Sequence, residues 1–348
     1  IIHQELGNAF PNISANSLNW NDKDYNDFIE NTKNQIDLIL NNLKNTKLVL
    51  FNEYSSIHFN SNLIENNYLD KASNELNLYL QEKKNIQKNL RIIPIEKITL
   101  KNGINQSVEF KKFYTFKELF TPSWFIEYSE QIKHHIFSIT GKIKKAVILD
   151  CDNTLWKGIV GEDGIDKIEM SSETKSGEIY KEVQLLLKTL PKKGILLCLC
   201  SKNNPEDVDE VINNHNDFLI SPDEITSKKV NWSDKASNIQ EIAKDLNIGT
   251  DSFIFIDDSD FEVNLVRNQL PEVTTFQVPK NLSDYPSMVK EVLNYFYRHE
   301  ITKEDLKKVE QYQLQAKRNE NKTSFSNMQD YIKSLEIKLK IFKDNSSH

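Results

Sequence analysis

The sequence has few cysteines, no long apolar run and no basic stripe, and each absence narrows the class of protein. Its 348 residues include three cysteines, without disulfide or zinc spacing, which is typical of a reducing, cytoplasmic compartment. No apolar run is long enough to span a bilayer, and no secretory signal is visible. The net charge is −7, and basic residues do not interleave with aromatic ones. We therefore predict a cytoplasmic protein with neither a membrane nor a nucleic-acid partner.

Residues 1–141 show helical and strand patterns but no recognisable chemical motif. Helical spacing of apolar residues covers 25–43, 73–89 and 122–140, and the short runs "KLVLFN" and "RIIPI" predict strands. A glycine-rich phosphate loop and a Gly-x-Ser-x-Gly motif are both missing. We predict a small α/β domain in this half, with chemistry that the sequence does not reveal.

From residue 142 the alternation of strands and helices becomes regular. The predicted strands are "AVILD", "ILLCLCS", "FLI" and "SFIFIDD", and helical patterns separate them. Such alternation predicts a parallel sheet with helices on both faces, over residues 142–298. Residues 299–348 read as a helical extension, followed by the strand-like "EIKLKIF". Because the chain starts without methionine and ends on this strand pattern, we expect both ends to be trimmed from a longer protein.

Polar side chains follow three of the predicted strands. Asp150 and Asp152 end the first, Ser201 ends the second, and Asp257 with Asp258 ends the last. In parallel sheets these ends meet at one edge, where ligands bind. Four carboxylates in one crevice require a cation, and oxygen ligands with few histidines nearby favour Mg²⁺ over zinc. We therefore predict a Mg²⁺ site formed by the four aspartates.

Mg²⁺ beside a carboxylate indicates phosphoryl transfer, in which catalysis is mostly positioning and charge neutralisation. Asp150 could attack phosphorus and form an aspartyl-phosphate, and Asp152 could protonate the leaving oxygen and later activate water. Lys235, at the start of a predicted helix, would add a positive charge. The candidate phosphate-binding residues are Asn153, Thr154, Ser201 and Lys235.

In this order the motifs resemble the haloacid-dehalogenase (HAD) superfamily of phosphotransferases. "DCDNT" is similar to its first motif, Ser201 to its second, Lys235 to its third and "IDD" to its fourth. The stretches "LDCDNTLWKGIVGEDG", "CSKNNPEDV" and "VNWSDKASNI" resemble the FkbH-like branch, phosphatase subfamily IIIC. The analogy favours Asp258 over Asp257 as the direct metal ligand, but the sequence by itself does not choose between them. The resemblance implies a HAD-type Rossmann-like core.

Members of this branch combine the core with an N-terminal domain resembling SGNH hydrolases, which the resemblance assigns to residues 1–141. Some carry a C-terminal acyltransferase-like domain, which would begin where this chain stops. The best-understood members take a glyceryl group from 1,3-bisphosphoglycerate, remove phosphate and load the group onto an acyl carrier protein. Others belong to surface-polysaccharide pathways. The resemblance therefore implies a phosphoglyceryl-type substrate and an acyl carrier protein or polysaccharide pathway as its destination.

The spacing of the motifs leaves no room for a large cap domain. The stretch after Thr154 holds little more than a glycine-rich hairpin, and one helix and one strand fill the stretch from Ser201 to Lys235. We therefore predict an open site that tolerates a large substrate, such as a group tethered to a carrier protein.

Two other functions and two interpretations of one cysteine remain open. The protein could be a stand-alone phosphatase of a small phosphorylated metabolite, or a module that binds phosphate groups without turnover. The thiol of Cys200, beside Ser201, could carry an acyl group as a thioester. Alternatively, Cys200 is a buried strand residue, like Cys198 on the same side of that strand.

Overall fold

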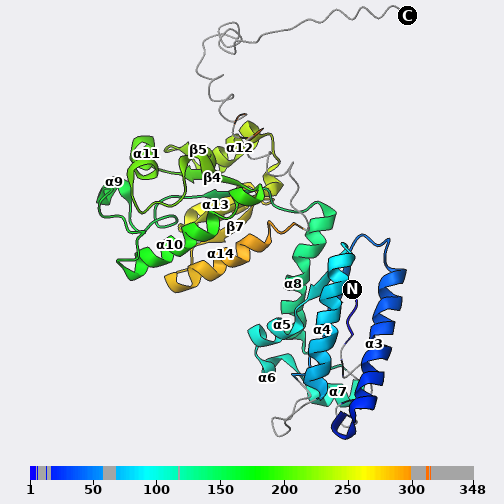
Figure 1. The fold of residues 1–348 in the computed structure, drawn as a ribbon. Coiled ribbons are helices and arrows are strands. Elements are labelled where there is room, and N and C mark those ends of the chain that lie inside the picture. Colours follow the sequence, from blue (N-terminus) through cyan, green and yellow to red (C-terminus); the bar gives the residue numbers. More distant parts are fainter. Residues whose placement is uncertain are drawn as a thin grey trace, which may run out of the picture. The chain divides into compact units, whose positions relative to one another are not determined.

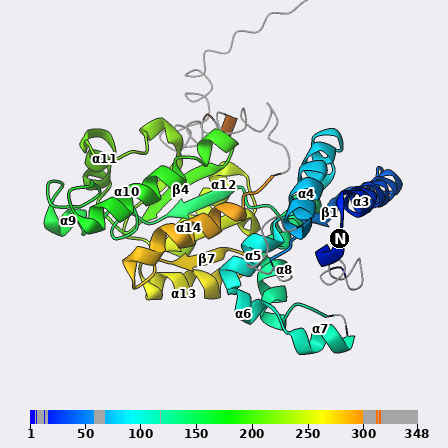
Figure 2. The same ribbon diagram turned by 60° about the horizontal axis from the view of Figure 1, so that its bottom comes forward.

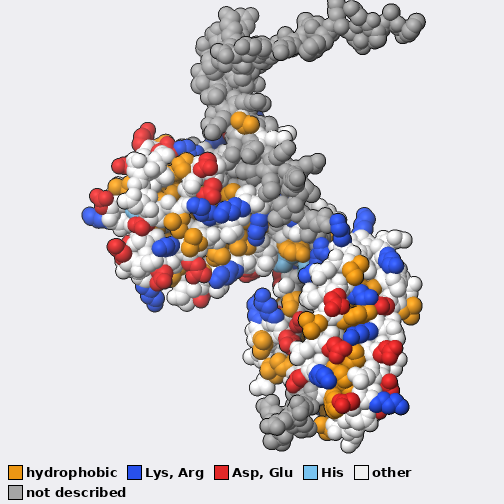
Figure 3. Space-filling model, in the orientation of Figure 1, with side chains coloured by type: hydrophobic (Ala, Val, Ile, Leu, Met, Phe, Trp, Pro, Cys, Tyr) orange, Lys and Arg blue, Asp and Glu red, His pale blue; other side chains and the backbone are white. Residues whose placement is uncertain are grey.

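The computed structural model describes residues 1–4, 6, 13, 17–57, 68–116, 118–298, 311, 312 and 314. The chain divides into two compact units, Ile1–Gly141 and Lys142–His348 (Figure 1). The predicted extension over 299–348, with its terminal strand, lies outside the described residues apart from Gln311, Tyr312 and Leu314. None of the described helices is long and apolar enough to cross a membrane. Acidic and basic side chains are interspersed on the face that Figure 3 shows.

The first unit is built around a parallel pair of strands, and its predicted helices and strands are confirmed. Leu50 packs against α5 and α8, whereas Val49 and Phe51 pack against α3 and α4. The last helix ends at Gly141, whose positive φ of 76° suits glycine. The elements are η1 (Ser17–Asn19), α3 (Asp22–Asn42), β1 (Val49–Asn52), α4 (Tyr68–Ile86), β2 (Leu90–Ile93), α5 (Ile95–Asn102), α6 (Ile104–Ser107), α7 (Phe110–Phe116) and α8 (Pro122–Thr140).

The second unit contains a five-stranded sheet in the order β5-β4-β3-β6-β7, with every pair parallel. The predicted parallel α/β core is therefore confirmed. Its elements are β3 (Ala146–Leu149), α9 (Val160–Asp163), α10 (Lys175–Leu187), η2 (Pro191–Lys193), β4 (Leu196–Ser201), α11 (Pro205–Asn214), η3 (Pro222–Glu224), β5 (Ile225–Val230), α12 (Lys235–Leu246), η4 (Thr250–Ser252), β6 (Phe253–Asp257), α13 (Asp260–Gln269), β7 (Thr274–Gln277), η5 (Leu282–Asp284) and α14 (Tyr285–Asn294).

Helices cover both faces of this sheet, because its central strands are apolar on both sides. Val147 and Leu149 of β3 pack with α10, α11 and α14 on one face. Ala146 and Ile148 pack with α12 and α13 on the other. Figure 2 shows α10 and α14 running side by side over the sheet. This arrangement leaves the carboxyl ends of the strands open for a site.

The two edge strands differ from the prediction. The segment "FLI" is not a strand: Ile220 is buried, but it contributes to the apolar core from a turn. The strand of this region is instead β5, "ITSKKV", and β7, "TTFQ", was also missed. Both lie at edges of the sheet, where a strand contacts one neighbour and tolerates polar and charged residues. The pattern of apolar residues therefore identified the central strands of the sheet but did not identify its two edge strands.

Candidate active site

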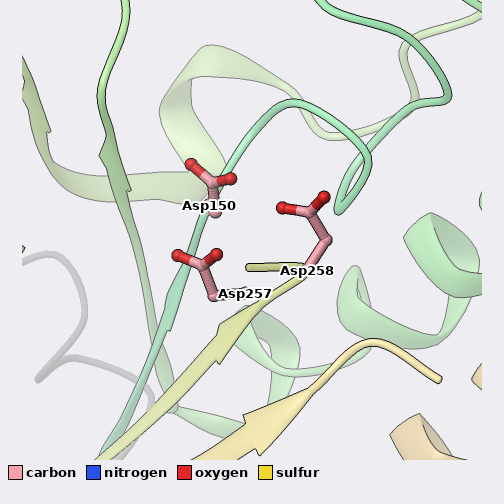
Figure 4. Close-up of side chains that lie close together, drawn as sticks. All are labelled: Asp150, Asp257 and Asp258. Carbon is pink, nitrogen blue, oxygen red and sulfur yellow. The ribbon is translucent and has the colours of Figure 1, made fainter. Parts of the chain in front are cut away.

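The carboxyl ends of β3 and β6 bring three aspartates together. Leu149 lies opposite Ile256, so the following residues, Asp150 and Asp257, are neighbours at the edge of the sheet. Figure 4 shows the carboxylates of Asp150, Asp257 and Asp258 close to one another. One oxygen from each lies within 4.8 Å of the others. Within the described part of the chain, this is the one group of three or more His, Cys, Asp or Glu residues that could hold a metal ion.

The ammonium group of Lys235 bridges two of these aspartates. Its Nζ lies 2.9 Å from Oδ1 of Asp150 and 2.6 Å from Oδ2 of Asp257. The helix that carries it, α12, begins directly after Asp234, whose side chain accepts a hydrogen bond from the backbone N–H of Ser237. Burial alone would lower the pKa of Lys235, but the charges of Asp150 and Asp257 outweigh it and raise that pKa. Lys235 is therefore a buried cation beside the predicted nucleophile.

One ammonium does not balance three carboxylates. Asp257 is completely buried, and burial and the charge of Asp150 raise its pKa against the opposing effect of Lys235. Burial and Asp150 also raise the pKa of Asp258. With all four groups ionised, two negative charges remain uncompensated. A divalent cation with a preference for oxygen ligands would neutralise them, so the residues fit Mg²⁺.

The carboxylate of Asp152 lies outside the cluster of Asp150, Asp257 and Asp258, and its role as a metal ligand stays a prediction. Its Oδ1 accepts hydrogen bonds from the indole N–H of Trp156 at 2.9 Å and the backbone N–H of Val160 at 3.0 Å. Its Oδ2 accepts one from Nδ2 of Asn203 at 2.7 Å. Both oxygens are therefore engaged by neutral donors. The carboxylate is fixed in orientation, as a proton donor and acceptor requires.

The other three predicted phosphate-binding residues, Thr154, Ser201 and Asn153, each have a different environment. Thr154 is completely buried, and its hydroxyl has no hydrogen-bond partner among the described residues. Ser201 is buried, and its side chain partly offsets the burial that raises the pKa of the Cys151 thiol. The side chain of Asn153 instead stabilises the turn, because its Oδ1 accepts a hydrogen bond from the backbone N–H of Gly158 at 3.2 Å. Their roles toward phosphate remain predictions.

The structure contradicts an acyl-carrying role for Cys200. This residue is completely buried between the sheet and α12, in one apolar cluster with Cys198. Burial strongly raises the pKa of its thiol, with a smaller opposing effect from Lys235. A nucleophilic cysteine needs an accessible thiolate. The strand direction turns Cys200 toward the apolar core, so it is a packing residue.

The described core unit carries no large cap insertion, as the motif spacing predicts. Between β3 and α10 the structure has the short helix α9 and a bridge pairing Lys157 with Glu169. Between β4 and α12 it has α11, η3 and β5, which belong to the core unit. No cap domain is inserted at either place, both of which lie wholly within the described residues.

Three polar residues near the site were not singled out from the sequence. Asn203 orients Asp152, as described above. The ammonium of Lys202 lies 2.6 Å from Oε1 of Glu262, which is 7% exposed at the start of α13. Lys202 and Asn203 directly follow the strand that ends at Ser201, and this position in the sequence could have identified them as site residues. No sequence signal pointed to Glu262, because a glutamate in the first turn of a helix is common.

Searches of family models and of curated proteins find no match to this chain. A crystal structure of the N-terminal part of the protein BF1531 from Bacteroides fragilis is similar to 84% of this chain, over 78% of its own length. It has 27% sequence identity, a TM-score of 0.72 and a phosphatase domain complexed with Mg.

Two further structures match smaller parts. The HAD family enzyme bt-2542 from Bacteroides thetaiotaomicron, in complex with magnesium and inorganic phosphate, has 13% identity and covers 40% of this chain and 96% of its own. A HAD-superfamily hydrolase from Ehrlichia chaffeensis has 16% identity and covers 43% of this chain and 98% of its own. Both have a TM-score of 0.28, which is too low to support an inference. Over most of its length this chain therefore shares the fold of a structure that contains a magnesium-bound phosphatase domain.

Proposed function

We propose that this protein is a magnesium-dependent phosphatase of the HAD type, with Asp150 as the nucleophile. The observation that carries the proposal is the environment of Asp150. Its side chain is 7% exposed, is paired with Lys235 and lies beside Asp257 and Asp258 at the carboxyl edge of a parallel sheet. The similarity to BF1531, which contains a phosphatase domain complexed with Mg, supports both the reaction class and the metal.

Each step can be assigned to a group in this site. An oxygen of Asp150 attacks phosphorus while the bond to the leaving oxygen breaks, and Asp152 gives that oxygen its proton. A water molecule then attacks the aspartyl-phosphate and gives a proton to Asp152, and phosphate leaves as Asp150 is restored. Asp150, Asp257 and Asp258 would hold Mg²⁺, which supplies positive charge next to the phosphoryl oxygens. Lys235 holds the carboxylate of Asp150 in place.

Phosphate release measured with a panel of phosphate esters and acyl phosphates tests the proposal. We expect release that requires Mg²⁺, stops with excess chelator and returns when Mg²⁺ is restored. If no member of the panel is hydrolysed although Mg²⁺ and phosphate bind, the protein is the phosphate-binding module considered above.

A finer proposal, from the FkbH-like resemblance, is that the substrate is a phosphoglyceryl group delivered to an acyl carrier protein or a polysaccharide pathway. The lack of an inserted cap in the described core favours it, because no such domain restricts a carrier-tethered substrate. The burial of Cys200 requires that the acyl group pass without a thioester on that residue. Mass spectrometry of a carrier protein, after incubation with this enzyme and 1,3-bisphosphoglycerate generated in place, tests it. An unmodified carrier together with free phosphate would favour the stand-alone phosphatase.

We expect Asp258→Asn to weaken Mg²⁺ binding by at least about tenfold, because it removes one of three charged oxygen ligands. Isothermal titration of the metal-free protein with Mg²⁺ measures the change. Asp260→Asn is the matched control, since this exposed aspartate lies two residues along the chain and contacts Asn264 instead. Equal affinities for the two variants would remove Asp258 from the metal site.

We expect Asn203→Ala to lower kcat about tenfold while the protein stays folded. It removes the 2.7 Å hydrogen bond to Oδ2 of Asp152 and leaves the two bonds to Oδ1, so that carboxylate becomes less well oriented. Steady-state phosphate release measures the effect. The control is Asn213→Ala. Asn213 is an exposed asparagine of α11 whose side chain donates a hydrogen bond to the backbone carbonyl of Asp209 on the same helix. Unchanged kcat for Asn203→Ala would show that Asp152 does not need this donor.

A further inference from the structure

An exposed tryptophan lies on the loop that leads to Lys235. Trp232 is 70% exposed, whereas Trp124 and Trp156 are completely buried. It lies on the loop between β5 and α12, three residues before Lys235. Its indole donates a hydrogen bond to Asn204, and the neighbouring Asn203 donates one to Asp152, so the indole lies near the candidate proton donor. An exposed indole leaves a large apolar surface in water, and such exposure indicates a surface that can bind a ligand.

The loop of Trp232 is joined to the site on both sides. Before it, the backbone N–H of Asn231 donates a 3.1 Å hydrogen bond to the carbonyl of Ser201, at the end of β4. After it, the ammonium of Lys235 contacts Asp150 and Asp257. The loop is therefore positioned by the same strand ends that position the candidate catalytic groups.

The indole ring itself is held in place although it is exposed. Its Nε1–H donates a 3.2 Å hydrogen bond to Oδ1 of Asn204. The amide of Asn204 in turn donates through Nδ2 to Oδ2 of Asp207, at 3.0 Å. These bonds orient the ring without covering its faces, which remain available for stacking.

We propose that Trp232 forms a leaving-group subsite, in which its indole stacks on the ring of a ring-bearing phosphate ester whose phosphate group reaches Asp150. The ring is a sugar, which presents apolar C–H groups to an aromatic side chain, or a nucleobase, which presents a flat aromatic face. This inference rests on the proposed phosphatase function and names a substrate class that is an alternative to the phosphoglyceryl group. With no cap domain between these loops, the leaving group contacts residues of the core unit, and Trp232 offers it the largest exposed apolar surface on the β5–α12 loop. Asn204 is a positioning residue, because it acts through Trp232.

Kinetics with three substrates test the subsite. The substrates are a hexose phosphate, a nucleoside monophosphate and glycerol phosphate, which has no ring. For Trp232→Ala we expect KM for ring-bearing substrates to rise about tenfold, with kcat within about twofold and glycerol phosphate unaffected. Trp232→Phe keeps an aromatic face and should recover most of the affinity, and Asn204→Ala should have a smaller effect of the same kind. Leu185→Ala, at an exposed position of α10, is the control.

A binding measurement separates this inference from the proposed function. In the Asp150→Asn variant with Mg²⁺, calorimetry compares the same esters with inorganic phosphate. We expect at least one ring-bearing ester to bind about tenfold more tightly than glycerol phosphate, and Trp232→Ala to abolish the difference. The ester that binds more tightly than glycerol phosphate shows whether the ring is a sugar or a nucleobase. Equal affinities for all esters, or a preference that survives Trp232→Ala, would overturn the subsite, whereas binding without turnover in the unsubstituted protein would overturn only the phosphatase.

Discussion

Asp150→Asn should reduce phosphate release by at least about 10³-fold, because an amide cannot form the aspartyl-phosphate. The substitution preserves the size of a side chain that is only 7% exposed. Lys235 keeps its 2.6 Å contact with Asp257, and the repulsion among the three carboxylates decreases. We therefore expect a folded variant whose thermal midpoint is no lower than that of the unsubstituted protein. Phosphate release and thermal denaturation measure the two quantities.

Asp251→Asn is the matched control for this prediction. Asp251 is an exposed aspartate in η4, which precedes β6 and therefore lies at the opposite edge of the sheet from Asp150. We expect its phosphate release to be unchanged. If Asp150→Asn retained more than about a tenth of the activity, another group would have to be the nucleophile.

Lys235→Met should lower the free energy of unfolding by about 3–5 kcal/mol, because it leaves two buried carboxylates without their shared cation. Methionine fills most of the space, so the main cost is electrostatic. We expect Mg²⁺ to stabilise this variant more than it stabilises the unsubstituted protein, since the metal replaces part of the lost positive charge. Phosphate release should fall by about 10²-fold or more even with Mg²⁺ present. Urea denaturation with and without Mg²⁺ measures the stability changes.

The control for Lys235→Met is Lys290→Met. Lys290 forms an ion pair of 2.9 Å with Glu182, and these side chains are 57% and 49% exposed. Because solvent screens such a pair, its loss should cost less than about 1 kcal/mol. Similar losses for the two variants would mean that burial does not distinguish these ion pairs. A loss at Lys235 that Mg²⁺ leaves unchanged would show that the metal does not bind among these carboxylates.

The sequence by itself determined the core strands and which residues stand at their ends. An apolar run such as "AVIL" is buried on both faces of a parallel sheet, so its composition alone reveals it. The following residue then lies at the carboxyl edge, which placed Asp150 and Asp257 side by side before any contact was known. The order of the motifs also predicted that Lys235 would supply positive charge there.

The tertiary structure alone decided where the edge strands run and how each polar side chain is turned. The strand β5 is polar because it has one neighbour, so its residues carry little apolar signal. Asp152 and Cys200 lie close to the site in sequence, yet one is held by Trp156, Val160 and Asn203 and the other faces the core. These orientations depend on partners distant in the chain, such as Asn203 for Asp152 and α12 for Cys200. Sequence spacing can place a residue at the edge of a sheet, but only packing determines which way its side chain points.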